Sequence, residues 1–153
     1  MTGTAAVPSL ETQDSEALRA ALAAGDGAHH EAALGGFVVE GEARRARLML
    51  CHGAGAGHDS PFLVRLRQQL ATRGIQVVAL EFDYMATMRK EGKRRPPPRI
   101  ERLVAELAEW RRALLALDGE TPLWVGGKSM GGRVASLLAT QVEVAGLVLC
   151  GYP

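Results

Sequence analysis

Residues 123–140 read LWVGGKSMGGRVASLLAT, an apolar run followed by a glycine pair, a serine, a second glycine pair and a helical pattern. Within it, residues 127–131 form the pattern G-x-S-x-G around Ser129. A serine at a sharp turn from strand to helix has a strained backbone, and the residues two before and two after it must be small to keep strand and helix apart. Such a turn exposes the hydroxyl above the sheet, where the N–H of Met130 and the helix dipole face a carbonyl oxygen under attack. The pattern therefore predicts Ser129 as a nucleophile, with Gly127 and Gly131 as the small residues of the turn.

The alternative interpretation of this pattern is a plain glycine-rich turn, because the chain contains 18 glycines. The flanking residues favour the nucleophile site. A β-type apolar run, Leu123 to Val125, precedes the turn, and Val134, Leu137 and Leu138 follow it at helical spacing.

The composition is that of one globular domain. The 153 residues carry 18 basic and 17 acidic side chains, and 47% are hydrophobic. A net charge of +1 gives no overall attraction to nucleic acid or to an anionic membrane. No apolar run approaches the roughly 20 residues that span a bilayer, and the N-terminus lacks a basic start followed by an apolar core. We expect a cytoplasmic protein without a cofactor and without nucleic-acid or membrane partners.

The first part of the chain, residues 1–36, has few large apolar residues. Leu18 and Leu22 give a possible helix over residues 15–24 one weak apolar stripe, too little to hold it folded alone. We expect a mobile or loosely docked arm over 1–36 and an ordered domain over 37–153. His29 and His30 suggest a metal site, but no cysteine or carboxylate cluster at ligand spacing supports one.

A second glycine-rich segment, HGAGAGH, occupies residues 52–58 and follows an apolar run over 46–51. A dinucleotide fingerprint would need glycine where the chain has His58 or Ser60, so that hypothesis fails on spacing. The other hypothesis is an oxyanion loop, in which small residues let backbone amides approach a carbonyl oxygen. The amide of Ala54, or of Gly53 one residue earlier, is the expected donor. His52 is expected to shape the loop rather than to act as a base.

The remaining pattern predicts an α/β protein. Ser60 and Pro61 suit the start of a helix that ends before Gly74, and residues 75–82 form a run typical of a strand buried on both faces. An irregular segment is expected over 83–99, a helix over 100–117 and a last strand over 144–149. The fold class is a mostly parallel, doubly wound sheet with helices on both faces.

The segment before the second long helix is basic and carries three consecutive prolines. Arg94 and Arg95 are candidates for contact with an anionic substrate, and the segment is also a candidate surface for a protein partner. The alternative is a solvated loop that proline stiffens. Nucleic-acid binding is disfavoured because no stacking aromatics interleave with the charges.

The order of these motifs resembles the α/β-hydrolase superfamily. More narrowly, CHGAGAGHDSPF (51–62), FDYM (82–85), GKRRPPPR (92–99) and GGKSMGGRVAS (126–136) resemble its dienelactone-hydrolase-like branch, which includes testis-expressed protein 30 and the third subunit of the non-specific-lethal chromatin complex. The resemblance covers position 37 onward. It implies Ser129 as the nucleophile, and Met130 with the amides of residues 53–54 as the oxyanion hole. The strand order that it implies separates Cys51 from Cys150 by one strand, too far for a disulfide.

The chain departs from this family after the serine. Hydrolases of this fold place an acid and then a histidine beyond the nucleophile, but here every histidine precedes Ser129 and Glu143 is the only later carboxylate. A serine needs a base to take its proton, so the chain is expected to be inactive or impaired. It corresponds to a hydrolase truncated after about the sixth strand, or to a natural short form that binds without cleaving. The first is favoured because a sheet cut there exposes an apolar edge, a second candidate surface for a protein partner.

Two other roles for residues around Ser129 are disfavoured: Lys128 as the missing base, and GKS as part of a phosphate-binding loop. Lys128 is adjacent to the serine, but neighbouring side chains at such a turn diverge, so we expect a surface lysine. The letters GKS also end a phosphate-binding P-loop, but that loop would need glycine at Pro122. The resemblance implies hydrolysis of an ester or thioester of a small acyl substrate through an acyl-enzyme, with a non-catalytic binding scaffold as the alternative.

Overall fold

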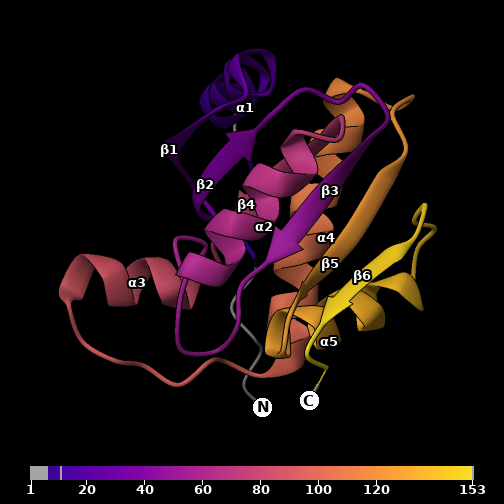
Figure 1. The fold of residues 1–153 in the computed structure, drawn as a ribbon. Coiled ribbons are helices and arrows are strands. Elements are labelled where there is room, and N and C mark those ends of the chain that lie inside the picture. Colours follow the sequence, from indigo (N-terminus) through magenta and orange to yellow (C-terminus); the bar gives the residue numbers. More distant parts are fainter. Residues whose placement is uncertain (1–6, 11, 153) are drawn as a thin grey trace.

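The computed structural model describes residues 7–10 and 12–152 and shows a six-stranded sheet flanked by helices (Figure 1). The strand order is β1-β2-β4-β3-β5-β6, with β1 and β2 antiparallel and the other neighbours parallel except for the antiparallel pair β2 and β4. The described chain forms, in order, α1 (Thr12–Ala24), β1 (Asp26–Ala32), β2 (Gly35–Glu40), β3 (Ala46–Cys51), α2 (Pro61–Ala71), β4 (Ile75–Leu80), α3 (Asp83–Glu91), α4 (Ile100–Leu117), β5 (Leu123–Lys128), α5 (Met130–Ala139) and β6 (Leu147–Cys150). The predicted mostly parallel α/β fold is confirmed.

Helices cover both faces of the sheet, which is why the central strands are apolar without alternation. In β3, Leu48 and Leu50 pack beneath α2, whereas Met49 and Cys51 face the opposite core with α1, α4 and α5. A strand with two buried faces has no polar side, so a contiguous apolar run is what the fold requires.

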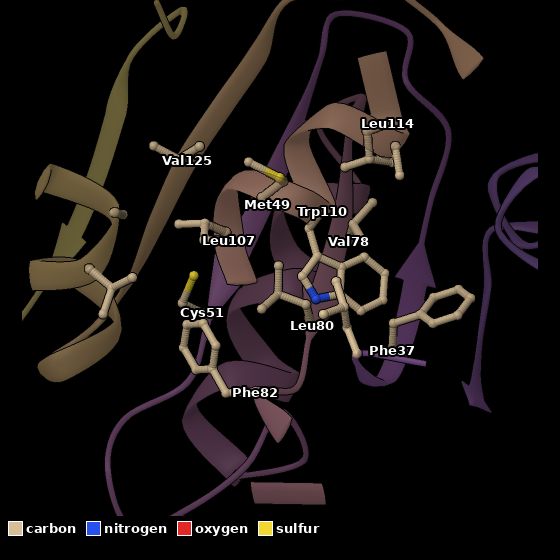
Figure 2. Close-up of a cluster of buried hydrophobic side chains, with 14 of the residues drawn as sticks. Phe37, Met49, Cys51, Val78, Leu80, Phe82, Leu107, Trp110, Leu114 and Val125 are labelled. Atoms are coloured by element: carbon tan, nitrogen blue, oxygen red, sulfur yellow. The ribbon is translucent and has the colours of Figure 1, made fainter. Parts of the chain in front are cut away.

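The larger core lies between the sheet and α4 (Figure 2). Trp110 is fully buried there, and its ring meets Phe37 of β2 edge to face at a centroid distance of 5.5 Å. The apolar positions of α4 recur with helical period and supply one continuous buried stripe. Its buried apolar residues are Leu103, Val104, Leu107, Trp110, Ala113 and Leu114. The predicted helix over 100–117 is confirmed, with Asp118 as its C-cap.

The expectation of a loose arm over residues 1–36 is wrong for its described part after residue 11. Leu18 and Leu34 have no exposed surface and lie in the larger core. β1 pairs with β2 as the outer strand of the sheet, and Gln76 donates a hydrogen bond to the carbonyl of Leu22 at the end of α1. A stripe too weak to hold an isolated helix is enough when the sheet supplies the apolar partner. Residues 1–6 and 11 lie outside the described part.

A second correction concerns residues 83–91, which form α3 instead of an irregular segment. Tyr84 and Met85 are buried on its inner side, and Gly92 ends the helix in the left-handed conformation, with its N–H bonded to the carbonyl of Met88. The prolines that indicated a loop lie beyond the end of this helix, in residues 92–99, which are exposed and have no regular structure.

The two cysteines are separated by one strand, as predicted, because β5 lies between β3 and β6. Both thiols are free, but only Cys51 is fully buried, and Cys150 is half-buried because β6 is an outer strand. Among the residues described, no helix is long and apolar enough to cross a membrane.

Candidate active site

The turn at Ser129 has the strained geometry that the sequence predicts. Ser129 has φ 52° and ψ −115°, and it is the one non-glycine residue with positive φ in the described chain. It follows the last residue of β5 and directly precedes the first residue of α5. Its N–H donates to the carbonyl of Cys150 (2.9 Å), which ties the turn to β6. Such strain persists only where surrounding contacts impose it.

The contacts at Gly127 and Gly131 explain why both positions lack a side chain. A Cβ on Gly127 would lie 2.6 Å from the carbonyl carbon of Gly131, so the start of the helix and the end of the strand touch directly. A Cβ on Gly131 would lie 2.5 Å from the carbonyl oxygen of His52. Backbone meets backbone at both positions, and the turn therefore brings α5 against the loop after β3.

That loop and Ser129 share one cavity of about 300 Å³. β3 and β5 are parallel neighbours, so the segments after them emerge at the same edge of the sheet, the lower edge in Figure 1. The cavity is lined by Gly53, Ala54, Gly55, Ala56, Ser60, Lys128 and Ser129. Ser129 is half-exposed, and its Oγ has no hydrogen-bond partner among the described residues. The structure thus brings together the two segments that the sequence analysis paired.

Two side chains fix the direction of the peptides in the loop. Nδ1 of His52 donates to the carbonyl of Gly53 (2.7 Å), and the Tyr84 hydroxyl donates to the carbonyl of Ala54 (2.9 Å). In a trans peptide the C=O and the N–H of the next residue point in opposite directions. The N–H of Ala54 is therefore turned away from the buried imidazole of His52, which leaves it available to a ligand.

His52 has no exposed surface, and both of its ring nitrogens are engaged. Nε2 accepts the N–H of Phe82 (3.1 Å) after β4, so the ring joins the ends of two strands. Burial lowers the pKa of His52 to about 4, which the hydrogen bond to Gly53 opposes only in part. A neutral ring with both nitrogens bonded suits a residue that shapes the loop.

Tyr84 is the residue of this site that the motif analysis missed as an individual contributor. Its hydroxyl also lies 3.9 Å from the sulfur of Met130, so one phenol touches the loop after β3 and the first residue of α5. Burial, with the carboxylate of Glu106, raises the pKa of Tyr84 to about 12 and keeps the hydroxyl a donor. The only signal in the sequence was the place of Tyr84 in FDYM. The direction of its side chain depends on α3, which the sequence analysis did not predict.

The two arginines of the basic segment lie in different surroundings. A Cβ on Gly55 would lie 3.4 Å from a terminal nitrogen of Arg94, so this guanidinium is beside the cavity. Arg95 instead pairs with Glu91 at 3.1 Å and lines a separate hollow between α3 and α4. The Nζ of Lys128 lies 5.2 Å from the centre of the Phe62 ring, at the rim of the cavity.

The other titratable candidates lie away from Ser129. His29 and His58 contact each other, Nδ1 to Nε2, at 3.1 Å, and burial lowers the pKa of His58. Glu143 lines a hollow with Leu123, at the opposite end of β5 from Ser129. Among the described residues that line the Ser129 cavity, none is a histidine or a carboxylate. No group of three or more His, Cys, Asp or Glu in the described chain is arranged to hold a metal ion.

Comparison with known proteins bears on the family and the fold of the chain. A profile of the alpha/beta hydrolase domain matches residues 44–153, whereas a search of curated proteins finds no match. A serine hydrolase without a lid from Xanthomonas campestris superposes with a TM-score of 0.61 at 20% identity, over 76% of this chain and 56% of that one. An α/β serine hydrolase homologue from Coxiella burnetii gives 0.63 at 16% identity, over 74% and 55%.

A dienelactone hydrolase from Anabaena variabilis gives a TM-score of 0.59 at 15% identity, over 74% of this chain and 54% of that one. This chain therefore spans about half the length of the solved proteins that it matches. The structural likenesses concern the fold, and the profile covers well over half of the sequence. The chain belongs to the α/β-hydrolase family.

Proposed function

We propose that this protein is a serine hydrolase that cleaves an ester or thioester through an acyl-enzyme, with Ser129 as nucleophile. The observation that carries the proposal is the strained turn at Ser129, which opens into the cavity that the 53–56 loop also lines. Strain of this kind is an unusual cost for a residue with only a structural role. A place in the dienelactone-hydrolase-like branch is supported by one of the solved likenesses.

In the proposed reaction, Oγ of Ser129 bonds to the carbonyl carbon, the bond to the leaving oxygen or sulfur breaks, and water later releases the acyl group. The N–H groups of Met130 and Ala54 are the proposed donors to the developing oxyanion, with Gly53 holding the turn that presents the second amide. Met130 is the first residue of α5, so its N–H has no partner within the helix. Preorganised donors of this kind lower a barrier most when they need no rearrangement.

The hydroxyl proton needs an acceptor, and the described lining of the cavity contains no histidine or carboxylate to take it. His52 has both ring nitrogens bonded, and Lys128 is turned toward Phe62. We therefore propose that the 153-residue chain reacts slowly by itself. Without a histidine, the fraction of reactive alkoxide rises about tenfold per pH unit, with no plateau near neutrality.

A fluorophosphonate reagent tests this assignment. Labelling of the 153-residue chain, followed by mass spectrometry of peptides, should locate the adduct on Ser129, and its rate should climb steadily from pH 7 to pH 10. Ser129→Ala should abolish the adduct. Ser60→Ala is the matched control, because Ser60 lines the same cavity with an ordinary φ of −60°, and this variant should keep the adduct. Undiminished labelling of the Ser129→Ala chain would show that another group reacts.

The second candidate function is a non-catalytic scaffold, and one observation favours it. The outer strand β6 exposes Leu147 and Leu149, at 39% and 44%, beside a backbone edge that pairs with no further strand of the described residues. An exposed apolar edge strand is a template for pairing with a strand of another protein. Absence of any adduct in a folded preparation across the whole pH range would favour this function over hydrolysis.

A further inference from the structure

The cavity at Ser129 is positively charged. Lys128 is the one charged residue among its described lining residues, and the guanidinium of Arg94 lies beside Gly55, which also lines the cavity. The N-terminus of α5, a helix of ten residues, adds its partial positive charge at the same place. In Figure 1 the α3–α4 segment that carries Arg94 runs along this lower edge of the molecule.

Neither cation is neutralised by the protein. Arg94 has no ion-pair partner among the described residues, whereas its neighbour Arg95 is paired with Glu91. Lys128 lies over the Phe62 ring, a contact that fixes the ammonium group without cancelling its charge. Asp59, the one carboxylate of residues 52–60, lies beside Gly57 and does not line the cavity.

The size of the cavity limits what these charges can hold. A volume of about 300 Å³ is at the small end for ligand sites and suits a short acyl chain. Two cations beside one small cavity match a compact anion such as a carboxylate or phosphate, which accepts hydrogen bonds from several donors at once.

We propose that Arg94 and Lys128 form an anion subsite, so that the substrate is a small ester or thioester that carries a carboxylate or phosphate a few bonds from the scissile carbonyl. This proposal rests on the proposed hydrolase function. The anion neutralises Arg94 and Lys128, and its tether places the carbonyl between Ser129 and the amides of Ala54 and Met130. A neutral ester of the same length lacks that anchor.

A binding experiment tests the subsite without requiring turnover. Monomethyl glutarate, butyl phosphate and neutral methyl butyrate are titrated separately into ¹⁵N-labelled 153-residue protein at low salt, and the amide signals of residues 53–56 and 128–130 are followed. Both anions should bind roughly tenfold more tightly than methyl butyrate, and the preference should shrink as salt screens the charges. Preference for only one of the two anions identifies which group the subsite takes.

Matched variants then locate the effect. Arg94→Gln should bring the affinity for the anions close to that for methyl butyrate, and Lys128→Gln should lower it several-fold. Arg95→Gln changes the same charge at the next position and should leave the preference intact, because Arg95 pairs with Glu91. All three side chains are exposed, so the variants should fold as the parent does.

Three results would overturn the subsite: equal affinities for the anions and methyl butyrate, no measurable binding of any probe, or equal effects of Arg94→Gln and Arg95→Gln. These results are independent of the fluorophosphonate adduct at Ser129. A chain that forms the adduct but shows no anion preference retains the hydrolase proposal and loses this one. A chain that binds the anions but forms no adduct points to an anion-binding scaffold.

Discussion

The two glycine-rich segments beside the Ser129 cavity look alike in sequence. They differ in how much space surrounds their glycines. In the turn at Ser129, a Cβ on Gly126, Gly127 or Gly131 would lie 2.3–2.6 Å from backbone atoms. In the loop after β3, a Cβ on Gly53, Gly55 or Gly57 would find its nearest neighbour at 3.4–3.6 Å, and none of the three has a positive φ. The first segment needs glycine to fold, whereas the second has room for a side chain.

The difference indicates two separate roles for one residue type. Glycine in the turn lets β5, α5 and the end of β3 meet backbone to backbone, which fixes where the serine projects. Glycine in the loop leaves space above the amides, where a substrate would sit. Substitutions in the turn should therefore change stability, and substitutions in the loop should change access to the cavity.

The largest expected effect is that of Gly127→Ala. The new methyl group would overlap backbone atoms of Gly131 and Cys51, and neither can move without displacing α5 or β3. Overpacking of this kind costs typically 1–3 kcal/mol, and backbone neighbours place it at the upper end, about 3 kcal/mol. Chemical denaturation should show this loss. Gly131→Ala should lose about 1 kcal/mol less, because alanine favours the helix by about that amount.

The next effect concerns His52, which joins the two segments: its carbonyl touches Gly131 and its ring holds Gly53. Burial lowers the pKa of its ring from 6.5 to about 4, with Glu81 and Asp59 opposing the shift and His58 adding to it. Between these values the unfolded chain binds a proton that the folded chain does not. The free energy of unfolding should therefore fall by about 2 kcal/mol as the pH is lowered from 6.5 to 5.

Equilibrium denaturation at several pH values measures this fall, and His52→Gln isolates the contribution of one ring. His58, whose pKa burial also lowers, contributes in the same direction in both proteins. The parent should lose more stability than the variant does, because only the parent also has the His52 ring. Parallel pH profiles for the parent and His52→Gln would show that folding does not change the pKa of His52, and would remove its assignment as a ring that burial keeps neutral.

A smaller effect is expected from Tyr84→Phe, which removes only the hydroxyl that bonds the carbonyl of Ala54. Loss of one such hydrogen bond should cost about 1 kcal/mol in denaturation. The more telling readout is the fluorophosphonate adduct at Ser129, which should form several-fold more slowly because the Ala54–Gly55 peptide, next to the peptide that carries the Ala54 N–H, is no longer held in direction. A normal labelling rate in a variant with the expected loss of stability would give Tyr84 a purely structural role.

Much of the fold was predictable because its signals are local. The apolar runs of β3, β4 and β5, the period of α4 and the spacing around Ser129 each depend on neighbours in the sequence, and the structure confirms them. The ordered N-terminal segment was not predictable, since Leu18 and Leu34 gain their burial only from a sheet built by distant residues. The contact of Tyr84 with the loop spans 30 positions, and no periodicity encodes it.

The smallest expected effect, and the sharpest test of the contrast between the glycines, is Gly55→Ala. The added methyl group would meet only the flexible end of Arg94 at 3.4 Å, and alanine lowers the entropy of the unfolded chain. The free energy of unfolding should change by less than about 0.5 kcal/mol, because no fixed neighbour resists the substitution. Binding of monomethyl glutarate should nevertheless weaken a few-fold, because the methyl group lies between Arg94 and the cavity. A loss of stability as large as that of Gly127→Ala would mean that backbone geometry fixes both segments, and the distinction between a turn that needs glycine and a loop that leaves space for a ligand would fail.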